Sequence, residues 1–128
     1  YMAGGHADYD PAVPHDDFSM DHAIWENHIW PAIATRIPQF EAIKVMREWV
    51  GHYDMNTLDQ NAIVGPHSKI ANFLFLNGFS GHGLQQSPAM GRGTAEWLIY
   101  GGYRSLDLSP LGFSRVLRNE PFVEQAII

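Results

Sequence analysis

The residues that point to chemistry lie in a glycine-rich turn beyond the middle of the chain. Gly78, Gly81 and Gly83 follow an apolar run of strand length and precede residues 84–100, a segment of small and apolar residues that reads as a helix. The glycines permit a sharp turn and let the backbone approach a flat or charged group closely. A helix N-terminus offers free N–H groups and the positive end of the helix dipole. The pattern therefore predicts a helix start that faces an anionic or electron-rich ligand, such as a cofactor.

The same turn falls short of the dinucleotide-binding pattern Gly-x-Gly-x-x-Gly. Gly81 and Gly83 match its first two glycines, but Gln86 stands where the third belongs. The acidic partner expected about 20 residues later would be Asp107, which follows the helix with no strand to carry it. A complete dinucleotide site is therefore not predicted here, and a glycine turn that only reverses the chain is the simpler alternative.

Other polar residues carry weaker signals. His82 stands at the predicted helix start, where the dipole favours a neutral imidazole. No two of the 7 histidines have a ligand spacing within one helix, so no metal site is expected. Asp54, Asp59 and Asn61 read as turn formers without a catalytic partner. Ser80 lacks the Gly-x-Ser-x-Gly context of an activated nucleophile.

The composition of the chain excludes several classes of protein. The 128 residues make one domain's worth of chain, with 8 basic and 14 acidic residues and a net charge of −6. No basic stripe suits a nucleic-acid surface, and no apolar run approaches the roughly 20 residues that span a bilayer. The absence of cysteine excludes disulfides, zinc–thiolate sites and cysteine nucleophiles. We expect an intracellular protein, cytoplasmic or, if eukaryotic, mitochondrial.

Helices and strands are expected in both halves of the chain. Asp17 or Ser19 is the expected cap of a helix that runs toward Thr35, and Pro31 should kink it or start a second helix. Alternating apolar residues predict a strand over 42–53. We also expect the tail of a strand over 1–5, strands over 62–64 and 70–76, a helix over 84–100 that ends at Gly101-Gly102, and loop with short helix over 103–128. The fold class expected is α+β, with mixed or antiparallel strands packed against a long C-terminal helix.

Three motifs in order carry a family resemblance. Residues Trp49–Asp59, Ile63–Pro66 and Gly78–Gly83 resemble the C-terminal part of the D-amino-acid-oxidase-like flavoproteins, which include sarcosine and glycine oxidases. The resemblance implies a fragment of a two-domain FAD-binding oxidoreductase. Residues 1–50 would then end the substrate-binding domain, and residues 51–128 would return to the FAD-binding domain. The N-terminal half with the true dinucleotide pattern would be missing from this chain, which starts as if inside a fold.

The resemblance also implies a site. The cofactor-binding residues would be the turn and the helix start: Gly78, Ser80, Gly81, His82, Gly83, Leu84 and Gln85. The substrate side would be formed by His52, Tyr53 and Gln85. FAD would be non-covalent, since no cysteine is present, and its binding would need the missing N-terminal half as a partner. Gln85 stands where sarcosine-oxidase relatives have lysine, and Tyr53 stands near an arginine of glycine oxidases.

The function implied by the resemblance is oxidation of a small amine or amino-acid-like substrate by hydride transfer to the flavin. The fragment alone would be inactive, and its exposed surface allows a homo-oligomer. Two alternatives stay open at this point. One is a non-catalytic flavoprotein-fold scaffold or assembly factor, and the other is a stand-alone α+β binding module without flavin.

Overall fold

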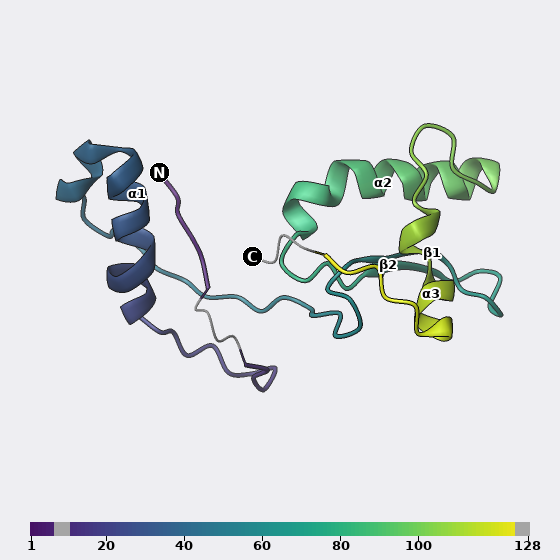
Figure 1. The fold of residues 1–128 in the computed structure, drawn as a ribbon, viewed down its shortest axis with the longest axis horizontal. Coiled ribbons are helices and arrows are strands. Elements are labelled where there is room, and N and C mark those ends of the chain that lie inside the picture. Colours follow the sequence, from purple (N-terminus) through teal and green to yellow (C-terminus); the bar gives the residue numbers. More distant parts are fainter. Residues whose placement is uncertain (7–10, 125–128) are drawn as a thin grey trace. The chain divides into compact units, whose positions relative to one another are not determined.

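The computed structural model describes residues 1–6 and 11–124 and divides into two compact units, which meet in sequence between His52 and Tyr53 (Figure 1). The first unit holds one regular α-helix, α1 (Trp30–Arg36). The second holds two strands and two helices, which are β1 (Ile63–Pro66), β2 (Leu74–Asn77), α2 (Gly83–Tyr100) and α3 (Phe113–Arg118). Helices and antiparallel strands together confirm an α+β composition.

The regular structure of the first unit consists of three successive helical pieces. A π-helical turn (Trp25–Ile29) leads into α1, and a 3₁₀ turn (Pro38–Ala42) follows α1. Pro31 lies in the first turn of α1, so the expectation that it starts a second helical piece is confirmed. The predicted caps are wrong, because Asp17 and Ser19 bond to each other at 2.6 Å in a local turn well before the helix. The carboxylate of Asp21 accepts the N–H of Ala23 at 2.9 Å instead.

The strand predicted over 42–53 is absent. Residues 43–53 form neither helix nor strand, and residues 1–5, expected to end a strand, are equally irregular. None of the residues 1–6 and 11–52 is buried, and Trp49 keeps 63% of its surface exposed. Apolar residues at every second position suit one face of a β-sheet, but a strand also needs a hydrogen-bonded neighbour. The described part of this unit supplies no such neighbour.

The second unit is built on a two-stranded antiparallel sheet. β1 pairs with β2 in the register Ile63↔Asn77 to Pro66↔Leu74. The strand predicted over 62–64 extends to Pro66, and the strand predicted over 70–76 begins later, at Leu74. The later start follows from a turn in which Phe73 donates its N–H to the carbonyl of Ile70 at 3.2 Å. The sheet is therefore the antiparallel alternative of the two expected.

α2 confirms the long predicted helix. It ends where expected, with Gly101 at φ +70° and its N–H donating to the carbonyl of Trp97 at 2.8 Å. Pro88 lies inside this helix. Proline has no N–H for the carbonyl of Leu84, and the Ser87 hydroxyl donates to that carbonyl instead, at 2.9 Å. The helix therefore continues past Pro88, and the carbonyl of Leu84 keeps a hydrogen-bond donor.

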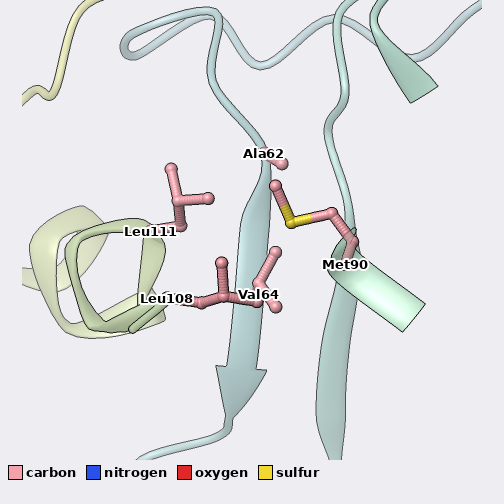
Figure 2. Close-up of a cluster of buried hydrophobic side chains, with 5 residues drawn as sticks. All are labelled: Ala62, Val64, Met90, Leu108 and Leu111. Atoms are coloured by element: carbon pink, nitrogen blue, oxygen red, sulfur yellow. The ribbon is translucent and has the colours of Figure 1, made fainter. Parts of the chain in front are cut away.

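The core of the second unit gathers around β1. Figure 2 shows its five buried side chains, which come from β1 and the residue before it, from α2 and from the C-terminal segment: Ala62, Val64, Met90, Leu108 and Leu111. The C-terminal segment folds back as a 3₁₀ turn (Ser109–Leu111) and α3, as the sequence predicts. Val64 is fully buried, and its β-branched side chain suits the centre of such a core.

The two glycines inside α2 differ in their surroundings. Gly93 is packed closely against a neighbouring side chain, whereas Gly91 is not. A Cβ at Gly93 would lie 2.3 Å from Cδ1 and 3.1 Å from Cγ of Leu108, whereas a Cβ at Gly91 meets no described atom within 4 Å. Gly91 faces solvent. Of the two, only Gly93 therefore has a packing reason to be glycine.

Gly91 and Gly93 make a matched pair for a stability test. Gly91→Ala should stabilise the second unit by up to about 1 kcal/mol, because alanine is the better helix former. Gly93→Ala gains the same propensity but overpacks buried Leu108 at about 1–3 kcal/mol, for a net loss of up to about 2 kcal/mol. Urea unfolding of the two variants measures both changes. Equal stabilisation by the two substitutions would contradict the packing of Leu108 on Gly93.

Candidate functional site

The turn between β2 and α2 is tightly wound. Gly78 (φ +71°), Ser80 (φ +49°) and Gly81 (φ +91°) all adopt the left-handed region of the backbone map. A side chain at Gly78 would be strained by its φ, and its Cβ would come within 3.3 Å of Cβ of Asn56. Gly78 and Ser80 are buried, Ser80 with 1% of its surface exposed. The glycines thus serve the sharp turn that the sequence predicts.

The segment before β1 holds this turn in place. The carboxylate of Asp54 accepts the N–H of Gly78, and the Asp54 carbonyl accepts the N–H of Ser80 at 3.0 Å. The N–H of Asn56 donates to the Ser80 hydroxyl oxygen at 2.9 Å. The hydroxyl in turn points at the carbonyl of Gly78, 3.3 Å away. Asp54 is therefore more than a local turn former, because it bridges to a turn 24 residues later.

The start of α2 leaves several N–H groups available. His82 is its N-cap residue, with φ −95° and ψ 6°, and its N–H donates to the carbonyl of Phe79 at 2.9 Å. Within the described chain, no side chain caps this helix start, and its first turn contains no acidic residue. The N–H groups of Gly83, Leu84 and Gln85 have no intrahelical acceptor, since they open the helix. Together with the dipole they can stabilise a negative charge that lies near the N-terminal end of the helix axis.

The predicted cofactor-side residues fall together in this one turn. Gly78 and Ser80 form its buried base, and Gly81, His82 and Gly83 are half-buried. The side chains of Leu84 and Gln85 are exposed, Leu84 at 85%. The His82 Nδ1 atom lies 3.2 Å from the carbonyl of Ser80, so this nitrogen carries the hydrogen in that contact. The assignment of these residues to a cofactor stays a prediction.

Two of the predicted substrate-side residues, His52 and Tyr53, flank the point in the sequence where one unit ends and the other begins, whereas Gln85 lies in the first turn of α2. His52 ends the first unit, where its ring stacks on Phe18 at 4.5 Å and its Nε2 lies 2.5 Å from the carbonyl of Asp17. Tyr53 begins the second unit and is 39% exposed. Their role toward a substrate, like that of Gln85, stays a prediction.

A buried ion pair in the second unit was not predicted from the sequence. Arg115 Nε donates to one carboxylate oxygen of Asp59 at 2.6 Å, and Nη2 donates to the other at 3.0 Å. Asp59 and Arg115 are 3% and 4% exposed. Burial opposes ionisation of Asp59, but bonds from Arg115 and from the N–H groups of Phe122 and Asn61 outweigh it and lower the pKa of this carboxyl. Asp59 was interpreted only as a turn former, because nothing in the sequence pairs it with a residue 56 positions away.

A second carboxylate, Glu96, anchors the far end of α2. It accepts the Ser105 hydroxyl and the N–H groups of Arg104 (2.8 Å) and Ser105 (3.1 Å). Above all the Ser105 hydroxyl, and then the two N–H groups, lower the pKa of Glu96 to about 2. Glu96 is therefore ionised near neutral pH and ties the loop after α2 to the helix. Its spacing of four from Arg92 is the only signal that the sequence offers.

Residues 1–6 and 11–124 contain neither a cluster of metal ligands nor a helix that could span a membrane. These residues contain no group of three or more His, Cys, Asp or Glu side chains that could hold a metal ion. No helix in the same residues has both the length and the apolar character needed to cross a membrane.

Known proteins similar to this chain are flavoproteins by name. The chain is 42% identical over 128 residues to "FAD-dependent oxidoreductase domain-containing protein 1" of Xenopus laevis, covering all of this chain and 26% of that protein. It is 45% identical over 112 residues to the Bos taurus protein of the same name, covering 88% of this chain and 23% of the relative. The Drosophila melanogaster homologue is 37% identical over 115 residues, with 90% and 22% covered.

The chain thus spans about a quarter of the length of the relatives that it matches. No solved structure matches it significantly. A family model described as FAD dependent oxidoreductase matches residues 1–97, which is most of the chain. The chain therefore belongs to the FAD-dependent oxidoreductase family.

Proposed function

We propose that this chain is the C-terminal portion of an FAD-dependent oxidoreductase that oxidises an amine or amino-acid-like substrate. The single observation that carries the proposal is the start of α2, where uncapped N–H groups follow a tightly braced glycine turn. Family membership supports FAD as the cofactor. The length of the relatives supports a larger protein in which other segments hold the rest of FAD.

The residues at the start of α2 fit the pyrimidine edge of a flavin. That edge gains negative charge when the ring takes up electrons, and fixed N–H donors stabilise such charge without reorganising. Gly83, Leu84 and Gln85 provide the donors, and the first turn brings no acidic residue that would oppose them. Gly81, in the left-handed conformation, lets the backbone approach a flat ring closely. FAD, when bound, supplies hydride acceptance, which no side chain of this chain can replace.

The chain's own residues would hold and orient rather than transfer electrons. Asp54 and Asn56 hold the turn, so that the donors keep their direction as charge develops on the ring. Gln85 offers an exposed neutral amide, suited to a hydrogen bond with a substrate rather than to an ion pair with a carboxylate. An amine without a carboxylate fits this side chain better than an amino acid does.

FAD titration tests the proposal. We expect the full-length protein that contains this segment to bind FAD and to resolve the flavin's visible spectrum. The 128-residue chain alone should bind weakly or not at all, because we assign the adenine half of FAD to other segments of a longer protein. Tight FAD binding by these residues alone would contradict the division of the site.

Anaerobic mixing of the full-length protein with a panel of amines and N-methyl amino acids tests the reaction. Loss of the flavin's visible absorbance with a simple amine is the expected result. FAD bound tightly but unchanged by every amine would contradict the catalytic part of the proposal and favour a scaffold.

A further inference from the structure

A polar network connects the buried ion pair with the glycine turn. Its first part fixes Arg115, whose Nη2 donates to the carbonyls of Asn61 (3.1 Å) and Ala62 (2.9 Å) besides the Asp59 carboxylate. Its Nε also donates to that carboxylate, and its Nη1 donates to the carbonyl of Leu111 at 2.5 Å. A planar guanidinium group with this many hydrogen-bond partners is held in one orientation. The backbone around Asp59 is therefore fixed from the C-terminal helix α3.

Asn56 links the ion pair to the glycine turn. Its Nδ2 donates to the Asp59 carboxylate at 2.8 Å and to the carbonyl of Asn61 at 2.6 Å. Its backbone N–H donates to the hydroxyl oxygen of Ser80 at 2.9 Å. Its Cβ also lies beside Gly78, within 3.3 Å of where a Cβ would stand. One residue therefore contacts both the ion pair and the base of the turn.

We propose that Asn56 is a positioning residue that, fixed by the Asp59–Arg115 pair, holds the Gly78–Ser80 turn and so aims the N–H groups at the start of α2. The ligand part of this inference rests on the proposed function. Ser80 supports the inference, because a buried serine at φ +49° needs its surroundings to keep it in that conformation. The role assigned to Asn56 is exerted through its bond to Ser80.

Amide hydrogen exchange tests the positioning without FAD. The reporters are the amides of Ser80, His82 and Gln86, which bond to Asp54, Phe79 and His82 respectively. Asn56→Ala should raise their exchange rates about tenfold, because the Asn56 backbone, whose N–H supports Ser80, loses the side-chain bonds to Asp59 and Asn61 that fix it. Ser80→Ala, which removes the acceptor for the Asn56 N–H, should have the same effect if Asn56→Ala fails to fold.

Glu96→Gln is the matched control, since it weakens a buried polar cluster at the opposite end of α2. It should raise exchange at Arg104 and Ser105, whose amides bond to Glu96, and leave the turn amides unchanged. A uniform rise across the second unit in Asn56→Ala would mean that Asn56 serves stability alone and would overturn the inference. Unchanged turn amides in both Asn56→Ala and Ser80→Ala would overturn it as well.

FAD affinity of the full-length protein provides the second readout. Asn56→Ala should raise the dissociation constant of FAD about tenfold, and Glu96→Gln should leave it within about twofold. If the unsubstituted protein binds no FAD, the proposed function fails, while the exchange experiment still decides whether Asn56 positions the turn. If FAD binds and neither variant changes its affinity, the proposed function stands and the positioning of ligand-facing N–H groups is refuted.

Discussion

Arg115→Ala should destabilise the second unit by about 3–5 kcal/mol, the largest effect on stability expected of any single substitution here. The substitution leaves the Asp59 carboxylate buried with its counter-charge removed, and it leaves the carbonyls of Asn61 and Ala62 without this donor. A buried charge without a partner costs far more than the bond that it loses. Because domains of this size are stable by about 5–15 kcal/mol, such a loss removes a large part of the total.

Native-state hydrogen exchange at β1 measures the effect in the correct unit. The amides of β1 lie at the centre of the core, so their slowest exchange reports opening of the whole second unit. The measurement should be made near neutral pH. The lowered pKa of Asp59 means that the stability it contributes is present above the unfolded-state pKa and is lost as the pH falls through the folded-state pKa. In strong acid the variant and the unsubstituted protein should therefore converge.

Arg118→Ala is the matched control on the same helix, α3. Arg118 pairs with Glu120 at 2.7 Å, close to the Arg115–Asp59 distance of 2.6 Å, but both members of this pair are more than half exposed. An exposed pair contributes about 0–1 kcal/mol, so the control should barely change exchange at β1. Similar losses from the two arginines would show that burial does not decide the strength of these pairs.

The sequence predicted the elements whose signals are local. The helix over 84–100 and its end at Gly101 depend on neighbouring residues alone, and both predictions are confirmed. The turn at Gly78 follows from glycine spacing, and the structure gives Gly78 and Gly81 the positive φ that glycine permits. Local signals therefore sufficed for the segment that carries the candidate site.

Features that depend on distant partners were missed or wrong. The alternating residues 43–53 form no strand, because pairing needs a neighbour that the described part of the first unit lacks. The partnership of Asp59 with Arg115 spans 56 residues, and that of Asp54 with Gly78 spans 24. A single sequence contains no signal for such pairs, so aspartates with long-range roles look like ordinary turn formers.

Leu84→Pro should lower the midpoint potential of FAD bound to the full-length protein by about 30–60 mV. The substitution deletes one N–H from the first turn of α2, where no intrahelical bond is lost. Gly83 before it has no Cβ to collide with the proline ring, and the Leu84 side chain is 85% exposed, so packing changes little. A hydrogen bond to a charged group contributes about 1.5–3 kcal/mol, and 1.4 kcal/mol corresponds to about 30 mV for two electrons.

The sign of this shift reports whether the donor faces the reacting ring. A donor that faces the edge of the ring stabilises the electron-rich form more than the electron-poor form, so its removal makes reduction harder and the potential falls. Leu84→Ala keeps the N–H and removes the same exposed side chain, so its potential should equal that of the unsubstituted protein. A donor that only bound FAD, without facing the charge that develops, would weaken binding and leave the potential unchanged. An unchanged potential in Leu84→Pro, with FAD still bound, would therefore place the start of α2 away from the reacting ring. Its N–H groups would then hydrogen-bond to water and not to the flavin.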